Sequence, residues 1–308
     1  PPRSTLFPYT TLFRSELTKL GIPLNEIIFV EHHAAHAAAA CYLSPWDLDE
    51  EVMVLTLDGQ GDGISSTVNI GHKGEIRRVE NSETSYYDSL GLSLPAQITA
   101  YLGMDWGFDA YKVMGLAPYG KPELSIDRIK QIIDIDKTNP LKFRNKVDAY
   151  LHAMQPKLRD MLKKDRFDNI AAATQSWFET LITKWVSNAV KETGIRKIAC
   201  AGGNFLNVKA NRKILSLDDV DDVFFCPAAS DEGLAVGAAL KGYFEIALRD
   251  GIKPVKEPLK SNYFGSSFTN DQIKDALKNH DMLDKAQYID DIDDEVGEIG
   301  RASCRERV

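Results

Sequence analysis

The sequence predicts a mixed α/β fold, in which buried strands alternate with helices along most of the chain. Residues 52–59 and 197–201 are apolar runs of strand length, too hydrophobic for strands with one exposed face. Between residues 169 and 193, apolar side chains recur every three or four positions, as on one face of a helix. Glycines directly follow two of the predicted strands, where tight turns would lead into the next element. Periodicity alone therefore supports a mixed α/β fold.

The elements are assigned from periodicity and from the residues that end each run. His72-Lys73-Gly74 is a hairpin turn, Asp168 is a good helix N-cap and Gly194 a helix C-cap signal. Pro95 interrupts one helical run, and 122–164 is mostly helical and charged. The predicted strands are 27–30, 52–59, 64–71, 75–80, 197–201 and 220–226. The predicted helices are 31–43, 89–102, 169–193, 204–215 and 231–248.

Both ends of the chain read as foreign sequence. TLFPYTTLFRS, residues 5–15, back-translates into a common short-read sequencing adapter, and IGRASCRERV, residues 299–308, lies within its reverse complement. We expect 1–15 and 299–308 to be adapter artefacts that flank an internal fragment of a longer gene, and they carry no information on the fold.

The chain is acidic, with a formal net charge of −8. The two foreign ends carry five arginines and one glutamate, so the residues between them carry −12. An acidic chain is a poor partner for a phosphate backbone, which counts against general nucleic-acid binding. Cys41, Cys200 and Cys226 are widely spaced in apolar contexts, as expected for buried, reduced cysteines of a cytoplasmic protein. No apolar run approaches the length of a membrane span.

From residue 52 the predicted order is β-β-β-α-β-α-β-α, which is typical of one domain type by analogy. It matches one lobe of the ribonuclease-H-like fold of the actin, sugar-kinase and Hsp70 ATPases, whose two lobes face each other across a nucleotide. On this analogy the domains would be 16–51, the end of a truncated first ATPase lobe; 52–249, the second lobe; 250–261, a linker; and 262–298, the start of a C-terminal domain.

Three of the six histidines fall within residues 32–36. His32 and His36 are four positions apart, so on a helix both imidazoles project from one face and can bind one metal ion. His33 points to another face and would be structural. A polar helix start without a metal explains the cluster equally well when this stretch is taken alone.

Carboxylates and glycines at strand ends could complete such a site. Asp58 ends a buried strand and enters a glycine loop, where a carboxylate can hold a cation and backbone N–H groups can approach phosphate. Gly202-Gly203 leads from a strand into a helix in the same way. Asp231 at the start of a helix is either an N-cap or a fourth ligand to a mixed nitrogen and oxygen site suited to iron, manganese or zinc. Ordinary tight turns explain both glycine pairs as well, and spacing alone does not bring the ligands together.

Five motifs occur in a fixed order along residues 27–249. They are HHAAHAAAACYLSP, VLTLDGQGD, YKVMGLAPYG, ACAGGNFLNVKAN and CPAASDEGLAVGAAL. Taken together they make the chain resemble the nodulation-protein and antibiotic O-carbamoyltransferase family. NYFGSSFTNDQIKDAL resembles the opening of the C-terminal, YrdC-like domain of that family.

The resemblance implies an ATP-dependent O-carbamoyltransferase. Such an enzyme moves a carbamoyl group from carbamoyl phosphate, through carbamoyl adenylate, to a hydroxyl of a sugar or natural product. It implies a divalent metal, foremost Fe²⁺ with Mn²⁺, Zn²⁺ or Mg²⁺ as alternatives, and a catalytic Lys112 near the phosphates or the carbamoyl adenylate. The implied metal ligands are His32, His36, Asp58 and Asp231. The implied nucleotide contacts are Gly59, Gly61, Gly202, Gly203 and Asn207.

The sequence departs from the family pattern at several points. Asn204-Phe205 replaces small apolar residues, and Asp109-Ala110 replaces the acidic pattern that precedes Tyr111-Lys112. The histidine-aspartate motif of the family's N-terminus and most of the YrdC-like domain are absent, so we expect the fragment to be inactive alone. Two alternatives stay open. One is a relative of the tRNA threonylcarbamoyl-transfer ATPase, against which the acidity and YKVMGLAPYG count. The other is a non-catalytic nucleotide- or metal-binding scaffold.

Overall fold

The structure is a computed structural model that describes residues 15–21 and 27–290. The chain divides into two compact units, residues 1–260 and residues 261–308. Within the described part of the second unit, the main element is helix α10 (Asn270–Asn279), which begins with a capping box between Thr269 and Gln272. The central sheet and the candidate site belong to the first unit.

A mixed sheet forms the centre of the first unit, in the order β3-β2-β1-β7-β8. The strands are β1 (Val52–Gly61), β2 (Ile64–His72), β3 (Glu75–Arg78), β4 (Thr84–Ser85), β7 (Lys197–Ala201) and β8 (Asp222–Phe225). β1, β2 and β3 are antiparallel neighbours, whereas β7 and β8 run parallel to β1, and β4 adds a short edge to β2. The predicted mixed α/β fold is confirmed.

Strand β1 is buried on both faces and separates two hydrophobic cores. Met53, Leu55 and Leu57 belong to the larger core, whereas Val52 and Val54 belong to the smaller one. Because side chains alternate along a strand, Thr56 and Asp58 point to the same side as the smaller core. This is the side on which the candidate site lies.

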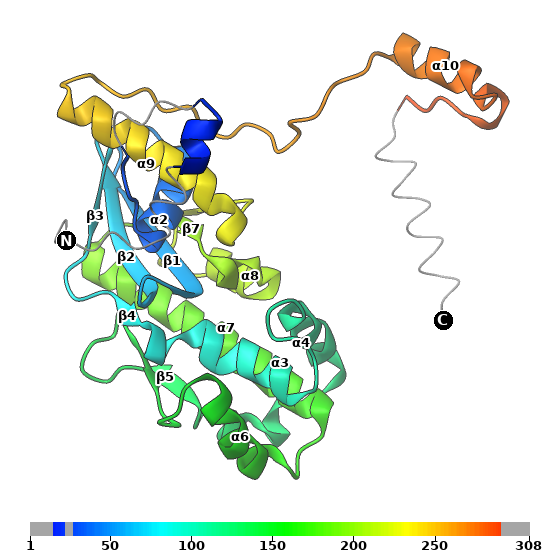
Figure 1. The fold of residues 1–308 in the computed structure, drawn as a ribbon. Coiled ribbons are helices and arrows are strands. Elements are labelled where there is room, and N and C mark those ends of the chain that lie inside the picture. Colours follow the sequence, from blue (N-terminus) through cyan, green and yellow to red (C-terminus); the bar gives the residue numbers. More distant parts are fainter. Residues whose placement is uncertain (1–14, 22–26, 291–308) are drawn as a thin grey trace. The chain divides into compact units, whose positions relative to one another are not determined.

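Helices α2 (His32–Leu43) and α9 (Leu234–Arg249) cover that side of the sheet (Figure 1). Small side chains let them approach closely, since a Cβ on Gly237 would overlap the carbonyl of Ala35. Further along, the rings of Tyr42 and Phe244 stack 3.7 Å apart. The alanine-rich helix α2 therefore packs closely against α9, with a close backbone contact at Gly237.

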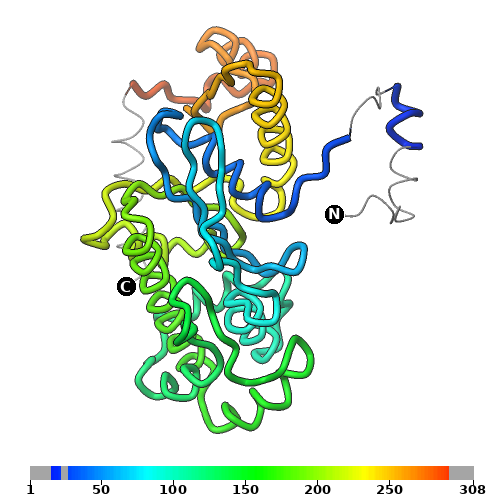
Figure 2. The backbone as a smooth tube through the Cα atoms, turned by 90° about the vertical axis from the view of Figure 1, so that its left-hand side faces the viewer, coloured from blue at the N-terminus to red at the C-terminus, as the bar shows by residue number. Residues whose placement is uncertain are grey.

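The opposite side is covered by the long helix α7 (Phe167–Thr193) and by the chain between β4 and β7 (green in Figures 1 and 2). The α-helices of this part besides α7 are α3 (Gln97–Tyr101), α4 (Ala110–Leu116), α5 (Ile126–Ile129) and α6 (Met154–Leu162). It also contains a hairpin of β5 (Ile133–Ile135) and β6 (Phe143–Asn145). Helix α8 (Val208–Leu215) follows β7.

Short helical turns join these elements. Leu92–Ala96 is a π-helical turn, η2, that contains Pro95. The 3₁₀ turns are η1 (Tyr86–Asp88), η3 (Ala117–Tyr119), η4 (Pro122–Leu124), η5 (Leu151–Ala153), η6 (Gly203–Leu206), η7 (Asp231–Gly233) and η8 (Leu283–Lys285).

Several predicted elements differ from the observed ones. Residues 27–30 form no strand, because no strand pairs with them, and the side chain of Phe29 is 74% exposed. The run 122–164 is not mostly helical, since it contains the β5–β6 hairpin. Pro95 divides 89–102 into η2 and α3. Helix α7 begins at Phe167 with Arg166 as its N-cap, so Asp168 lies in its first turn; its predicted end at Gly194 is confirmed by a left-handed φ of 73°.

The three cysteines of the first unit, Cys41, Cys200 and Cys226, are buried and free, as predicted. None of the helices in the described part of the chain combines the length and hydropathy needed to cross a membrane. The predicted adapter segments lie, apart from Ser15, outside the described residues.

Candidate metal centre and adjoining pocket

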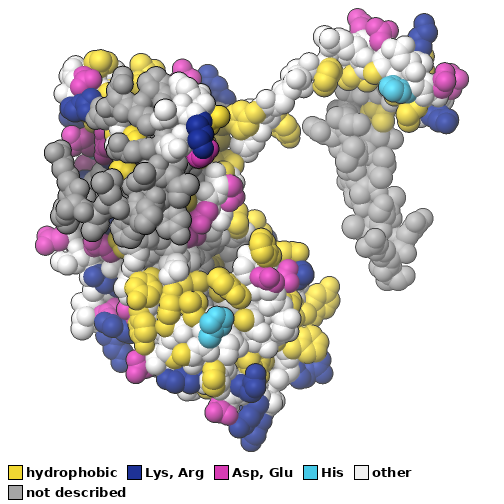
Figure 3. Space-filling model, in the orientation of Figure 1, with side chains coloured by type: hydrophobic (Ala, Val, Ile, Leu, Met, Phe, Trp, Pro, Cys, Tyr) yellow, Lys and Arg dark blue, Asp and Glu magenta, His cyan; other side chains and the backbone are white. Residues whose placement is uncertain are grey.

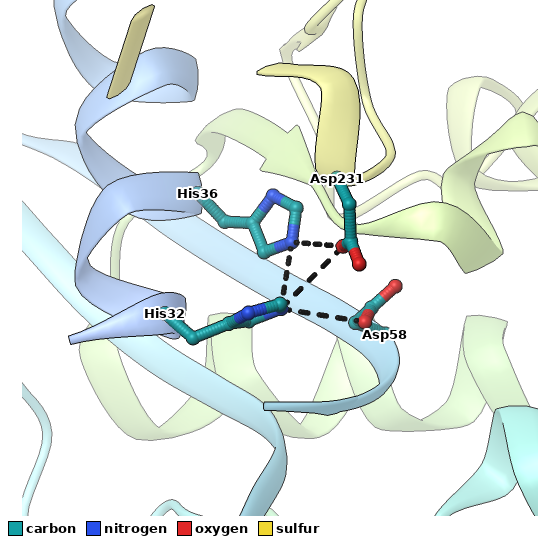
Figure 4. Close-up of side chains that lie close together, drawn as sticks. All are labelled: His32, His36, Asp58 and Asp231. Atoms are coloured by element: carbon teal, nitrogen blue, oxygen red, sulfur yellow. Dashed lines mark hydrogen bonds and ion pairs between the residues drawn. The ribbon is translucent and has the colours of Figure 1, made fainter. Parts of the chain in front are cut away.

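Four side chains from three parts of the chain converge at one point (Figure 4). His32 and His36 lie on the first turns of α2, and their Nε2 atoms are 3.2 Å apart. His32 Nε2 lies 3.4 Å from Asp58 Oδ2 and 3.6 Å from Asp231 Oδ1, which is 3.5 Å from His36 Nε2. One potential ligand atom of each residue lies within 4.8 Å of all the others. The structure thus brings together four residues that their spacing in the sequence alone could not place at one point.

The spacing of these atoms fits one transition-metal ion. With metal–ligand bonds of about 2.1 Å, neighbouring ligand atoms lie about 3.0–3.4 Å apart, depending on the coordination angle. Two of the four contacts, at 3.2 and 3.4 Å, lie within this range, and the other two, at 3.5 and 3.6 Å, slightly exceed it. Two imidazoles and two carboxylates are a donor set for iron, manganese or zinc rather than calcium. The residues present therefore could hold such an ion.

Each of the two carboxylates is brought in by an irregular piece of backbone. Asp58 lies where the pairing of β1 with β2 shifts register between Leu57 and Gly61. Asp231 begins η7, directly before α9, and its side chain is 63% exposed. Ser230 rather than Asp231 precedes the helical turn, so Asp231 is not its N-cap.

The protonation of the cluster follows from burial and hydrogen bonding. The hydrogen bond to Asp58 raises the pKa of His32 above its usual value. Burial lowers the pKa of His36, whose side chain is inaccessible to solvent. Burial pushes the pKa of Asp58 upward, but hydrogen bonds from His32 and from the Gly203 N–H outweigh it, so this pKa is lowered. A neutral His36 and an ionised Asp58 are the forms that bind metals.

The start of α2 is held by polar side chains that sequence reasoning missed. Glu31 accepts hydrogen bonds from the N–H groups of His33 and Ala34, and Arg78 on β3 pairs with Glu31 at 2.7 Å. Asp62 accepts the N–H of His32 at 2.8 Å. Glu31 directly before an alanine-rich helix was the available signal, since acidic side chains favour helix N-termini.

His33 takes no part in the cluster. Its ring is buried, with Nδ1 2.7 Å from Thr56 Oγ1 and Nε2 3.0 Å from the Ile64 carbonyl. Burial lowers its pKa to about 4, so the ring is neutral near pH 7. The structure thus gives His33 the non-ligand position that its place on the helix indicated.

A pocket of about 530 Å³ adjoins the cluster. Asp58 and Asp231 line it together with aromatic and apolar side chains from the α4 region, including Trp106, Phe108 and Tyr111. Phe108 is 82% exposed and Tyr111 63%, and hydrophobic side chains are visible on the surface of this half of the unit (Figure 3). The aromatic residues within six positions, WGFDAY, were a signal that sequence reasoning did not use.

The predicted nucleotide contacts fall into two groups. Gly59, Gly203 and Asn207 line the pocket, but Gly61 and Gly202 do not. A side chain on Gly61 would overlap the His32 ring, so this glycine makes room for a candidate ligand. Gly202, with φ 108°, packs against the backbone of Leu57, where a Cβ would not fit.

Two of the pocket-lining groups already have partners. The Gly203 N–H donates to Asp58 Oδ1 at 2.8 Å. The Asn207 amide exchanges hydrogen bonds with the Gln175 amide and also accepts from the Ala210 N–H at the start of α8. In this structure these groups orient Asp58 and cap α8.

Lys112 lies apart from the cluster and is not among the residues that line the pocket. Its Nζ is 2.8 Å from Asp109 Oδ1 one helical turn earlier, and its side chain is nearly half exposed. The ion pair with Asp109 raises the pKa of Lys112. The structure therefore does not bring the predicted catalytic lysine together with the other site residues.

Comparison with known proteins identifies relatives of the chain. The family model described as Carbamoyltransferase N-terminus matches residues 5–240. Nodulation protein NolNO of Sinorhizobium fredii is 32% identical over 250 residues, 80% of this chain and 35% of that protein. Nodulation protein NolO of Bradyrhizobium diazoefficiens is 30% identical over 260 residues, 81% and 44% of the two chains. The chain thus spans less than half the length of these relatives.

Solved structures of HypF are similar at a lower level. The phosphate- and nucleotide-bound form of full-length HypF has a TM-score of 0.41 and 18% identity, covering 77% of this chain and 38% of HypF. HypF of T. kodakarensis has a TM-score of 0.48 and 16% identity, covering 77% and 39%. The assignment depends on the sequence relatives alone: through the match over residues 5–240 and its nodulation-protein relatives, the chain belongs to the carbamoyltransferase family.

Proposed function

We propose that this chain is the nucleotide- and metal-binding part of an ATP-dependent O-carbamoyltransferase. The observation that carries the proposal is that Asp58 and Asp231 belong both to the four-residue cluster and to the lining of the pocket. A cation held by the cluster and a ligand in the pocket would therefore be neighbours. His32 and His36 would complete the ligand set from α2.

The charge of the pocket supports a link between metal and nucleotide. Among the described residues that line it there is no lysine, arginine or histidine, while two are aspartates. Asp58 and Asp231 would repel the phosphates of ATP unless a positive charge lay between them. A divalent cation in the cluster would supply that charge and would polarise a phosphoryl or carbonyl oxygen.

The chain's own groups would act by position. The Gly203 N–H holds Asp58 Oδ1, which would leave Oδ2 to bind a cation without reorganisation of the carboxylate. Trp106, Phe108 and Tyr111 present ring faces and edges that would contact a planar base and would exclude water from a reactive intermediate. Lys112 would have to leave Asp109 to act as the catalytic residue near the phosphates.

The proposed reaction has two parts. Water first hydrolyses carbamoyl phosphate to carbamate and inorganic phosphate, and a carbamate oxygen then displaces pyrophosphate from the α-phosphorus of ATP. The hydroxyl oxygen of a sugar or natural product attacks the carbamoyl carbon of the resulting carbamoyl adenylate, AMP leaves with the bonding electron pair, and the hydroxyl proton is released to solvent. Membership of the carbamoyltransferase family supports the carbamoyl transfer. Iron as the metal and the cytoplasm as the compartment are further parts of the proposal.

The finer assignment of the fold is part of the proposal. The strand order β3-β2-β1-β7-β8, with β1, β7 and β8 parallel, supports a ribonuclease-H-like lobe over 52–249. The division of the chain after Lys260 supports a separate C-terminal unit. In the proposal this unit is the start of a YrdC-like domain, residues 262–298. The segment 16–51 would be the end of a first lobe, and 250–261 a linker.

Calorimetric titration of the chain tests the site. ATP is expected to bind with Fe²⁺ (anaerobically) or Mn²⁺ present and to lose most of its affinity after chelation, whereas uncharged adenosine binds under both conditions. Asp231→Asn should weaken ATP binding in the presence of the ion, and Asp271→Asn on α10 is the matched control. Equal ATP affinity with and without the ion would contradict the proposed coupling.

The reaction itself is tested on the full-length parent protein. It is expected to release pyrophosphate from ATP only when carbamoyl phosphate is added, and His36→Ala should abolish both metal binding and this release. Full metal content and activity in His36→Ala would show that the four-ligand site is wrong.

A further inference from the structure

A buried chain of hydrogen-bonded polar groups joins helix α2, which carries His32 and His36, to the central sheet. It runs from Asn69 through Thr67 and Thr56 to His33, all of them buried. Thr67 and Thr56 are directly opposite one another on β2 and β1. Their hydroxyl oxygens are 2.6 Å apart, and Asn69 Nδ2 lies 2.8 Å from Thr67 Oγ1. Another polar contact between α2 and β1, that of His32 Nε2 with Asp58 Oδ2 at 3.4 Å, belongs to the cluster itself.

The direction of every hydrogen bond in this chain follows from its end at the Ile64 carbonyl. A carbonyl only accepts, so His33 Nε2, 3.0 Å away, carries the ring proton and Nδ1 must accept. The Thr56 hydroxyl therefore donates to Nδ1 and accepts from Thr67. The Thr67 oxygen in turn accepts from the Asn69 amide, which also donates to the Val54 carbonyl. Each donor has one defined acceptor, so the ring has one tautomer and one orientation.

Two members of this hydrogen-bonded chain, His33 and Thr56, lie next to candidate metal ligands in the sequence. His33 follows His32 directly and precedes His36 by three residues on α2. Thr56 precedes Asp58 by two residues on β1, so both side chains point to the same side of the strand. A bond between His33 and Thr56 therefore fixes α2 relative to the strand that carries Asp58.

Apolar packing alone would not fix this position well. The buried face of α2 consists largely of alanines, whose apolar contacts are non-directional. A metal site needs its ligands within about 0.5 Å of their productive positions. The directional bonds of His33 meet that requirement because both ring nitrogens are engaged at once.

We propose that His33 is a positioning residue of the candidate metal centre, which holds His32 and His36 at the correct distance from Asp58 through its bonds to Thr56 and Ile64. The inference rests on the proposed metal-binding function and adds residues to it that do not touch the metal. Since both nitrogens of His33 are used, the ring acts through its neighbours.

Cobalt(II) titration of the 308-residue chain, followed by its visible d–d absorption, tests this role. Thr56→Val keeps the shape of the side chain but removes the hydroxyl, so His33 Nδ1 loses its donor. Cobalt affinity is expected to fall about 10- to 100-fold, as for other groups that orient metal ligands, and the absorption bands to shift. Thr56→Ser restores the hydroxyl and should return affinity and spectrum close to those of the unmodified chain.

Thr84→Val is the matched control. The buried hydroxyl of Thr84 accepts from the Phe143 N–H and takes no part in the hydrogen bonds that link Asn69 to His33. This variant is expected to leave cobalt affinity and spectrum unchanged. If Thr56→Val lowers thermal stability but leaves both cobalt readouts unchanged, the role is structural and the proposal is wrong. If Thr56→Val does not fold, Thr67→Val decides in its place, with reduced affinity supporting the proposal and unchanged affinity overturning it.

The metal centre and the positioning role of His33 can be disproved separately. An unmodified chain that binds no cobalt overturns the metal centre and, with it, the positioning role. An unmodified chain that binds cobalt through His36 and Asp58, with no response to Thr56→Val, overturns the positioning role alone.

Discussion

The two sides of the central sheet are organised differently. On the α7 side, large apolar side chains such as Trp185, Phe178 and Leu181 fill the space and are fully or almost fully buried. On the α2 side, alanines fill the space, and the helix is fixed by the backbone N–H groups that donate to Glu31 and Asp62 and by the hydrogen bonds of the His33 ring. Apolar packing contributes much free energy of folding but has no preferred direction, whereas hydrogen bonds have a preferred geometry and so orient the groups that they join. The candidate site lies on the side where position is set by polar groups.

The largest expected effect is a loss of stability on the α7 side. Trp185→Ala removes a fully buried ring and its hydrogen bond to the Leu141 carbonyl, and should lower the free energy of unfolding by about 3–5 kcal/mol. Cobalt affinity of the folded fraction should not change. Urea unfolding and cobalt titration measure the two quantities, with Trp185→Phe as a milder control. A large fall in cobalt affinity in the folded protein would remove the contrast between the two sides.

The second-largest expected effect on stability follows from the close packing of α2 against α9. Gly237→Ala forces a methyl group into the Ala35 carbonyl and should cost about 1–3 kcal/mol of stability. It should also weaken cobalt binding, because α9 follows directly from the turn that carries Asp231. Gly242→Ala in the same helix meets no neighbour and should instead stabilise by up to about 1 kcal/mol. Similar outcomes for the two variants, by thermal unfolding, would argue against a tight crossing.

A polar anchor on the α7 side should act on stability alone. Asp136 accepts hydrogen bonds from Thr138 and Asn139 and pairs with Arg144 across the β5–β6 hairpin, which holds its pKa below the usual value. A carboxyl group whose pKa is lowered by folding stabilises the protein above its unfolded pKa of about 3.9, and this contribution is lost as the pH falls through the folded pKa.

The corresponding test compares Asp136→Asn with the unmodified chain by urea unfolding between pH 7 and pH 3. The unmodified chain should be the more stable at pH 7, and the difference should shrink toward pH 3. A difference that stays constant with pH would mean that the ionised form of Asp136 has no special role. Cobalt affinity at pH 7 should be the same in both.

The smallest expected effect concerns Arg78, which supports the cap of α2. Arg78→Gln removes the pair with Glu31 but leaves the cap itself, so the loss of stability should stay below about 1 kcal/mol. Because the pair is partly exposed, the loss should nearly vanish at 1 M salt. Unfolding at low and high salt checks this, and an effect that does not depend on salt would rule out a charge interaction.

The sequence predicted those elements that are marked by a local pattern, such as an apolar run or a terminating glycine. Strand 197–201 and the end of α7 at Gly194 were located from apolar runs and one glycine. The strand expected at 27–30 failed because an apolar run needs a pairing partner, and β5 and β6 were missed because three-residue strands give too short a pattern. Pairing is a property of the tertiary structure, which periodicity does not contain.

The candidate site was predictable in its ligands but not in its supports. His32 and His36 follow from helical spacing, Asp58 and Asp231 were offered by their places at a strand end and a helix start, and the family resemblance implied all four as one set. The structure brings the four to the same point. Thr56 and Thr67 gave no signal, because two threonines on different strands become partners only through strand register. Lys112 was chosen by motif, and its ion pair with Asp109 depends on the side-chain conformation of α4.

The most direct test of the metal centre is a crystal of the chain grown with Fe²⁺ or Co²⁺ and measured at the absorption edge of that metal. The anomalous difference map should show one strong peak for the metal ion. That ion should be within bonding distance of Nε2 of His32, Nε2 of His36 and one carboxylate oxygen each of Asp58 and Asp231. The peak should disappear in His36→Ala crystals soaked under the same conditions. A metal peak elsewhere, or an unchanged peak in His36→Ala, would contradict the four-residue site.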